Sequence, residues 1–446
     1  MLQKEIVLKL NLASVIILLY LSILVFPFEV LGQVDSTFVS SYIDEGQPII
    51  GIMDIEEDLD LTFPQNGSLI PYGVPQSYFD FKDDLYDKIG LKIGVSYQML
   101  FQSASELAPQ STNDNALGHW WGFNAKWTAI NKGKDFEGSL VFTGHERVSV
   151  GNNAVPAQYG AGDIGAIWSN FEWTEWYFSI EDFYWEQWLK NNRFMFRIGN
   201  QIPTTIYNSF RFKDARTSFT SSPFAFHESI PYPTYGLGVA FKWWLIQDSE
   251  LYIVGTLNDM NGDPNVRGFD WSTFGRGEYF YGIEIGKNWK REGGEFDHLH
   301  LDIFYADKRS TRSPELLPNE AGWGFKILGS KQVNKWVAYA SYTYNTAEGG
   351  GISVTFAEHT GTLGLSYTKP FDLPGEISLG LMVMKPIEDI LPIPDMRTQY
   401  GIEPYWKILL TPNLWVTPGV QFIINPSLNP NVDFVSVPHI KFRLAL

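Results

Sequence analysis

Residues Tyr279–Trp289 read YFYGIEIGKNW, and their Tyr and Ile side chains alternate with mostly small or polar ones. Successive side chains of a β-strand point to opposite faces of the sheet. Tyr281, Ile283 and Ile285 would therefore share one face. Glu284 would point from the other face, so one side of this strand suits an apolar environment and the other suits water.

Comparable alternation continues along most of the chain. From Lys88 to Leu446 we identify about sixteen stretches, each close to the roughly ten-residue alternating segment of a membrane-spanning strand, and merging one pair would give about fourteen. His298–Ala306 and Ile377–Met384 are further clear cases. A charged side chain facing lipid at mid-bilayer costs about 2–4 kcal/mol, so the charged faces would line a watery lumen. A closed barrel of about sixteen strands leaves an aqueous channel.

Connections between the stretches alternate between short and long. The short ones are Asn131–Asp135, Lys190–Asn191, Gln247–Asp248, Pro370–Leu373 and Thr411–Pro412. The long ones include Gly151–Glu172, Gln201–Pro233 and Asp259–Glu278. Outer-membrane barrels have short periplasmic turns at one end and long extracellular loops at the other. The sequence therefore predicts an all-β fold, a transmembrane antiparallel β-barrel over residues 88–446.

The composition supports this class and argues against several functions. Phe, Trp and Tyr make up 16% of the residues, which suits aromatic belts at two membrane interfaces. The absence of Cys excludes thiol chemistry, disulfides and Cys-ligated metals, and a net charge of −17 argues against nucleic acid as a partner. The Gly-x-Ser-x-Gly motif of many hydrolases is missing. We predict neither an enzyme nor a cofactor, and a secreted sugar-binding β-protein remains the alternative class.

Residues 1–32 have the features of a secretory signal peptide. Lys4 and Lys9 precede the apolar run Leu10–Val25, and Val30–Gly32 offers small residues for cleavage. We expect an exported product rather than a retained transmembrane helix, because no second apolar run of spanning length follows.

Residues 33–87 are expected to form an N-terminal periplasmic segment with one short helix. Ser77 would cap this helix, which would run through Lys88 at the periplasmic mouth of the barrel. The segment also holds an acidic cluster. Its members are Asp54, Glu56, Glu57, Asp58 and Asp60. We expect these carboxylates to form a solvated tail rather than a calcium site.

Several short blocks of sequence resemble those of one known family. The blocks are Arg197–Gly199 (RIG), Pro231–Gly238 (PYPTYGLG), Asn258–Gly262 (NDMNG), Gln399–Tyr405 (QYGIEPY), Leu410–Pro412 (LTP), Thr417–Gln421 (TPGVQ), Asn425–Pro426 (NP) and Asn429–Pro430 (NP). In this order they resemble the carbohydrate-selective porins, the OprB-type family of Gram-negative bacterial outer membranes, over residues 88–446. The resemblance implies passive diffusion of mono- or oligosaccharides through a porin. A porin for other small polar solutes is the alternative within transport, and the sequence is compatible with a monomer or a trimer.

A sugar-preferring pore needs a constriction that binds its solute weakly enough to release it. The resemblance favours Gln201–Pro233 as a loop that folds inward and forms this constriction. The candidate residues in the loop and on the wall are Arg197, Arg211, Lys213, Asp214, Arg216, Glu181, Glu284, Glu403 and Gln421. Arg197 is the first choice, because a guanidinium can bind two neighbouring hydroxyls. Glu181 and Glu284 are its expected partners on the wall.

His298 and His300 lie two residues apart and would share one strand face. This spacing suits two metal ligands, but a metal site needs at least one more, and no third ligand is evident in the sequence. We therefore predict no metal site.

Overall fold

Sixteen antiparallel strands form one closed barrel. The computed structural model of the chain describes residues 55–167, 173–189, 193–208, 210, 212–225, 229–245, 251–263, 266, 268–290, 296–310, 320–346, 357–387 and 393–446. The strands are β1 (Leu91–Ser103), β2 (Asn115–Ile130), β3 (Gly138–Ser149), β4 (Trp176–Leu189), β5 (Phe194–Gln201), β6 (Gly236–Trp244), β7 (Leu251–Asp259), β8 (Tyr279–Lys290), β9 (Phe296–Ala306), β10 (Gly322–Val333), β11 (Trp336–Asn345), β12 (Ala357–Thr368), β13 (Gly375–Pro386), β14 (Gln399–Thr411), β15 (Leu414–Ile424) and β16 (Phe434–Ala445). The predicted fold class and the higher of the two predicted strand counts are confirmed.

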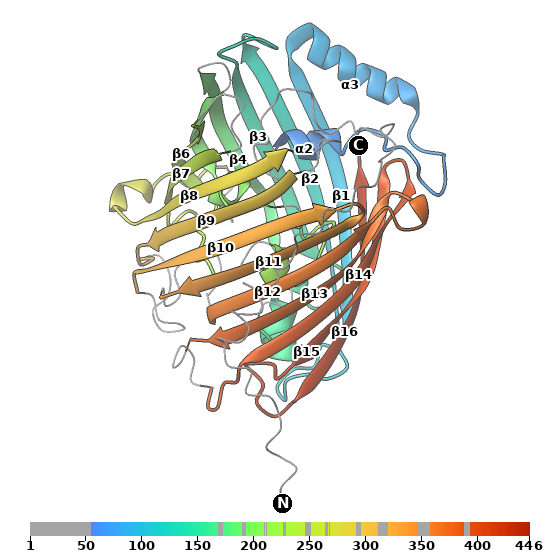
Figure 1. The fold of residues 1–446 in the computed structure, drawn as a ribbon, viewed down its shortest axis with the longest axis vertical. Helices are drawn as coiled ribbons and strands as arrows, with labels where there is room; N and C mark the ends of the chain where they lie inside the picture. The colour runs from blue at the N-terminus through green and yellow to red at the C-terminus, as the bar shows by residue number, and fades with distance from the viewer. Residues whose placement is uncertain are drawn as a thin grey trace, which may run out of the picture.

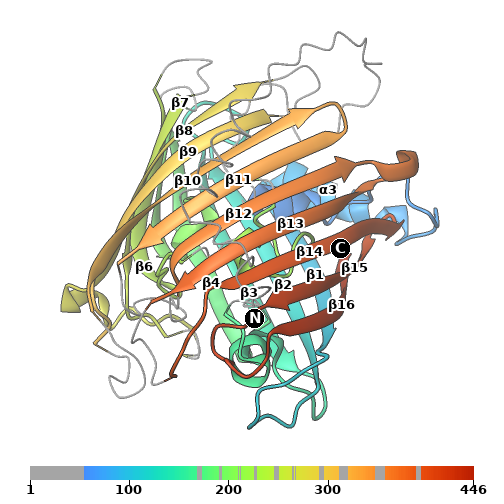
Figure 2. The ribbon, with the colours of Figure 1, turned by 60° about the horizontal axis from the view of Figure 1, so that its bottom comes forward.

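The barrel closes where the first strand meets the last (Figures 1 and 2). The register of β1 on β16 runs from Ser96 opposite Ala445 to Gln102 opposite His439. Just beyond these pairs, the backbones of Val95 and Leu446 exchange two hydrogen bonds of 2.7 Å. Closure pairs both edges of the sheet, and this matters in a bilayer because an unsatisfied backbone group costs several kcal/mol there.

Connections sort by length onto the two ends of the barrel, as predicted. At one end lie the strand ends that are separated in sequence by the short spans 131–137, 190–193, 245–250, 291–295, 334–335, 369–374 and 412–413. At the other end lie the strand ends that are separated by the longer spans 104–114, 150–175, 202–235, 260–278, 307–321, 346–356, 387–398 and 425–433. Short helical segments within these connections are α4 (Pro156–Gln158), η1 (Tyr159–Ile164), η2 (Pro203–Thr205), α5 (Ser222–Ala225), η3 (Phe274–Arg276) and η4 (Pro370–Asp372).

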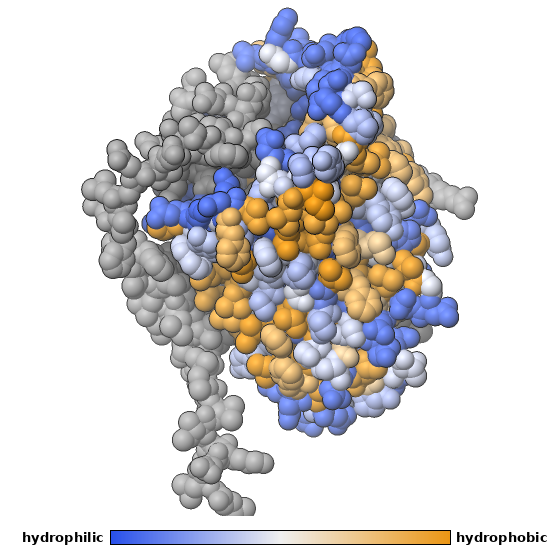
Figure 3. Space-filling view, turned by 90° about the vertical axis from the view of Figure 1, so that its right-hand side faces the viewer, coloured by the Kyte–Doolittle hydropathy of each residue, from blue (hydrophilic) through white to orange (hydrophobic). Residues whose placement is uncertain are grey.

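The two faces of the wall differ in polarity. On β8, Ile283 is 54% exposed on the outside, whereas Glu284 is fully buried on the inside. Figure 3 shows hydrophobic side chains spread over the outer wall, with hydrophilic ones gathered toward the two ends. Trp323 at the long-loop end of β10 and Trp336 at the short-turn end of β11 are each about half exposed. This placement agrees with an apolar band between two aromatic belts.

A helix fixes the entry to the first strand. Helix α3 (Gln76–Ile89) ends at Gly90, whose φ of 74° suits glycine, and a Cβ there would lie 2.5 Å from the carbonyl oxygen of Thr128. The Lys132 ammonium donates to the carbonyl oxygens of Tyr86 and Asp87 at 2.7 and 2.8 Å. The helix therefore lies against the rim that carries the short turns (Figure 1).

The predicted helix is confirmed, but its predicted cap is wrong. The residue that precedes the first turn is Pro75, and no side chain caps the helix. Ser77 lies inside the first turn, because the helix already begins at Gln76, after Pro75 in an extended conformation. Among the described residues, no helix is both long and apolar enough to cross a membrane.

We expect Leu381→Lys on β13 to destabilise the barrel by about 2–4 kcal/mol, because it would place a charge in the apolar band. Leu381 is 42% exposed and lies opposite Leu363 and Ile402. Reversible unfolding from lipid vesicles in urea would measure the loss, with Leu381→Ala as the control for lost packing. Equal stability of the Lys and Ala variants would mean that this face does not contact hydrocarbon.

Candidate pore constriction

The long connection 202–235, here called the inward loop, lies inside the barrel. The backbone N–H of Asn208 donates to Glu284 Oε2 on β8 at 2.5 Å. Thr220 and Ser221 donate their N–H groups to the two oxygens of Glu403 on β14, at 2.5 and 2.9 Å. Buried backbone donors need acceptors, and wall carboxylates supply them here. The predicted inward fold of this loop is confirmed.

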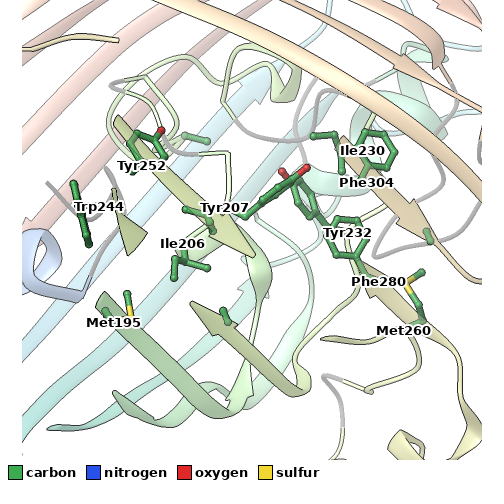
Figure 4. Packing of buried hydrophobic residues seen from close by; sticks show 14 of the residues in the cluster. Met195, Ile206, Tyr207, Ile230, Tyr232, Trp244, Tyr252, Met260, Phe280 and Phe304 are labelled. Atoms are coloured by element: carbon green, nitrogen blue, oxygen red, sulfur yellow. The ribbon is translucent and has the colours of Figure 1, made fainter. Parts of the chain in front are cut away.

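Aromatic packing holds the inward loop to the wall of β8–β14. Phe219 lies 4.7 Å from Tyr405 and 4.6 Å from Phe224, centroid to centroid. Gly380 on β13 makes room for these rings, because a Cβ at that position would lie 2.7 Å from Phe219. Further along, Tyr207 and Tyr232 meet edge to face above the wall side chains of β8 and β9, as Figure 4 shows. The loop is thus a packed part of the core.

A second segment also enters the barrel. Helix α2 (Ile55–Asp60) packs Ile55 and Leu59 against Val141 on β3 and Tyr184 on β4. Figure 1 shows α2 between the walls, near the end that carries α3. These contacts place the start of the described chain in the lumen.

Asp58 joins α2 to the inward loop and to the last strand. Its carboxylate accepts hydrogen bonds from Arg216 Nη1 and Nη2 at 2.9 and 2.7 Å, and from Arg443 Nη2 at 2.8 Å. The sequence favoured a solvated tail for this acidic cluster, and for Asp58 that prediction is wrong. The two buried guanidinium groups need carboxylate partners inside the barrel. Asp58 is one of these carboxylate partners.

Asp214 is the other carboxylate partner in this network. It accepts a 2.7 Å bond from Arg216 Nε and lies 3.4 Å from Arg443 Nη1. Burial by itself would raise the pKa of Asp214, but Arg216 and Arg443 outweigh that effect and hold the pKa well below its usual range. Asp214 therefore stays ionised and keeps both guanidinium groups in place.

A cavity remains between these segments and the wall of β2–β4. The centres of water molecules can occupy about 60 Å³ of it. Its lining combines aromatic rings with charged groups. The lining includes Trp120, Arg147, Trp176, Glu181, Arg216 and Tyr235. Because the inward loop and α2 fill the lumen on the other side, this cavity is the candidate constriction of the pore.

Arg147 lies at the centre of the lining. Its guanidinium carbon is 3.6 Å from the ring centroid of Trp120 and 5.2 Å from that of Trp176. Its Nη2 lies 3.5 Å from Glu181 Oε2, and Tyr235 packs edge to face on Trp176 at 5.3 Å. The arrangement places flat apolar rings beside hydrogen-bonding groups, and the charge of Arg147 is paired with that of Glu181.

The structure separates the predicted site residues into three groups. Glu181 and Arg216 line the cavity, and Asp214 holds Arg216. Glu284, Glu403 and Gln421 bind the inward loop from the wall, and Lys213 binds backbone carbonyls within the loop. Arg211 lies outside the described residues, as does the predicted signal peptide 1–32.

Arg197 lies behind the cavity wall. Its Nε donates to Glu186 Oε2 at 2.9 Å, and the other oxygen of Glu186 accepts from Lys126 at 3.0 Å. The prediction that Glu181 and Glu284 pair with Arg197 is thus wrong. The partner is Glu186, which lies opposite Arg197 in the register of β4 and β5. The Arg197 guanidinium also lies 4.8 Å from the ring of Tyr184, a ring that lines the cavity. Arg197 supports the constriction from behind.

Sequence reasoning missed Trp120, Arg147, Trp176 and Tyr235. The alternation on β2 and β3 does place Trp120 and Arg147 on the lumen face. Tyr235 lies in the block PYPTYGLG that supported the family resemblance. No local pattern indicates which sector of the wall the loop leaves uncovered, and that sector defines the cavity.

The prediction that His298 and His300 have no third potential metal ligand beside them is also wrong. One ligand atom of each histidine and one oxygen of Glu284 all lie within 4.8 Å of one another. Glu284 comes from the neighbouring strand β8, so spacing within β9 could not show it.

Comparisons with known proteins agree with this architecture. Residues 325–437, from β10 to β16, match the family model described as carbohydrate-selective porin, OprB family. The high-pH structure of OprB from Pseudomonas putida is 14% identical, with a TM-score of 0.64, and the match covers 83% of this chain and 97% of that one. The low-pH structure of the same protein is 12% identical, with a TM-score of 0.49, over 86% of this chain and 99% of that one. No curated protein matches the sequence. The match to the high-pH structure shows a shared fold.

We expect Asp58→Asn to release α2 from the lumen and raise single-channel conductance. The change leaves the buried Arg216 and Arg443 with a single carboxylate partner, and breaking such a buried pair costs about 3–5 kcal/mol. Planar-bilayer recordings and limited proteolysis near residues 55–60 would detect the release. Asp84→Asn is the matched control, because Asp84 pairs with Lys88 on the exposed side of α3. Unchanged conductance and cleavage in Asp58→Asn would contradict this role.

Proposed function

We propose that this chain is a carbohydrate-selective porin of the bacterial outer membrane. The family match over 325–437 and the closed barrel support a channel rather than an enzyme. Solutes would cross by passive diffusion through the cavity between the inward loop, α2 and strands β2–β4. The observation that carries the sugar preference is the stacking of Arg147 on Trp120 beside Glu181.

The chemistry of the lining matches that of a sugar. A sugar presents hydroxyls, which both donate and accept hydrogen bonds, around a ring whose C–H faces are apolar. Arg147 and Arg216 can donate to hydroxyl oxygens, and Glu181 can accept from hydroxyl hydrogens. Trp176 and Tyr235 offer flat surfaces for the C–H faces. A solute held by several weak contacts enters and leaves readily, as a channel requires.

The pairing of charges favours neutral solutes over ions. Arg147 has Glu181 within 3.5 Å, and Arg216 and Arg443 have Asp58 within 2.8 Å. A paired guanidinium still presents several N–H donors, while the adjacent carboxylate largely neutralises its charge. An organic anion would gain little from such a lining and would lose hydration on entry. Neutral polar solutes are therefore better suited than organic acids.

Liposome swelling with the refolded protein tests this function. We expect glucose and maltose to enter faster than amino acids and organic acids of matched size. In Arg147→Gln, the ratio of sugar entry to amino-acid entry should fall by about tenfold, the equivalent of about 1.4 kcal/mol. Arg397→Gln is the control, because Arg397 pairs with Asp433 at the long-loop end of the barrel, away from the cavity.

Two outcomes would count against this function. Entry governed by size alone in the parent protein would reduce the function to a general pore. An unchanged ratio in Arg147→Gln, with parent-like folding, would remove the assigned lining from the constriction.

A further inference from the structure

A cluster of titratable side chains lies on the lumen face of β7–β9 and does not line the cavity. His298 and His300 come from β9 and Glu284 comes from β8, where Gly286 lies directly opposite His300. A Cβ at Gly286 would lie 2.2 Å from the ring of Tyr252. Because Gly286 has no side chain, Tyr252 on β7 reaches across β8 to the histidines.

The ligand atoms of this cluster converge on one point. His298 Nε2 lies 3.1 Å from His300 Nδ1, and His300 Nδ1 lies 3.9 Å from Glu284 Oε1. The Tyr252 hydroxyl lies 2.5 Å from Glu284 Oε1 and 2.8 Å from His298 Nε2. In a tetrahedral zinc site with bonds of about 2.0 Å, the ligand atoms are separated by about 3.3 Å. The distances between atoms of this cluster, from 2.5 Å to 3.9 Å, lie on either side of that value.

We propose that Glu284, His298 and His300 bind a divalent transition-metal ion, with the Tyr252 hydroxyl or a water molecule as the fourth ligand. Two imidazoles and one carboxylate are a common donor set for Zn²⁺ and related ions. All three side chains are held by strands of the closed wall, so the site is preorganised rather than assembled by a loop.

A neighbouring carboxylate lies beside one of the histidines. Asp302 Oδ2 lies 3.3 Å from His300 Nε2, the ring nitrogen that faces away from the cluster. Metal-binding histidines commonly donate their second N–H to such a carboxylate, which fixes the tautomer and leaves the first nitrogen for the metal. Glu284 and Asp302 together would balance the two charges of the ion. The Lys242 ammonium, 4.4 Å from the ring of Tyr252, opposes this balance and weakens the site.

Metal binding would also act on the inward loop. Glu284 Oε1 faces the histidines, while its Oε2 accepts the 2.5 Å hydrogen bond from the Asn208 N–H of the loop. One carboxylate thus connects the metal site to the anchor of the constriction. An ion that fixes Glu284 would stabilise the attached loop, so Zn²⁺ should protect the loop from proteolysis.

Equilibrium dialysis of the refolded, chelator-treated protein against Zn²⁺, followed by elemental analysis, tests the site. We expect one ion per chain at micromolar Zn²⁺, and at least tenfold weaker binding in His298→Gln and His300→Gln. Glu284→Gln is a further variant, since its amide oxygen can still accept from Asn208 while the charge is lost. His359→Gln is the matched control, because His359 on β12 pairs with Tyr342 outside the cluster, and it should bind like the parent.

Two results would overturn the proposal. The first is no saturable Zn²⁺ binding by the folded parent protein, judged by its compact migration on unheated gels. The second is parent-like binding in Glu284→Gln and in either histidine variant that folds, which would mean an adventitious ion only. Sugar transport by the same preparations is measured separately, so failure of the metal site and failure of the porin function are distinguishable.

Discussion

The arrangement of the lumen depends on one kind of interaction. Carboxylates of the barrel wall accept hydrogen bonds from backbone N–H groups of the inward loop. A loop that leaves water for the lumen loses the hydrogen bonds of its peptide groups, and each loss would cost about 1–3 kcal/mol. Glu403 takes two of these donors and Glu284 takes a third. With the loop held on that side, open space remains against β2–β4, where the candidate constriction lies.

Charge pairing in the lumen follows from the same burial. Arg216 and Arg443 lie deep in the barrel, and ion pairing with Asp58 and Asp214 offsets the cost of removing them from water. The pairing leaves little net charge on the part of the lining that Arg147 and Arg216 supply. Under the proposed function, such a lining would discriminate between solutes by hydrogen bonding and ring stacking more than by charge.

The sequence predicted those features of the fold that depend on local periodicity. The alternation in β8, β9 and β13, together with the sorting of loops by length, was sufficient to predict a closed barrel. It also predicted a polar lumen and an apolar outer face. Helix α3 was predicted from apolar spacing, although Pro75 rather than Ser77 precedes its first turn.

Features that depend on contacts between distant segments could not be predicted in the same way. Asp58 lies far in sequence from Arg443, and nothing near it signals that a buried guanidinium is its partner. Glu181 and Arg216 were predicted as site residues, but Trp120 and Arg147 were not, because the packing of the inward loop decides which wall residues stay accessible. The partner of Arg197 and the third member of the histidine cluster depend on strand register, which the alternation leaves undetermined.

We propose that the aromatic-lined cavity, with Arg147 paired to Glu181, selects neutral sugars. Single-channel recording in planar bilayers, with glucose and gluconate titrated separately against the ionic current, tests it most directly. The two solutes are close in size and differ in charge. We expect saturable block of the current by glucose and much weaker block by gluconate at equal concentration. Equal block by both solutes, or stronger block by gluconate, would contradict it.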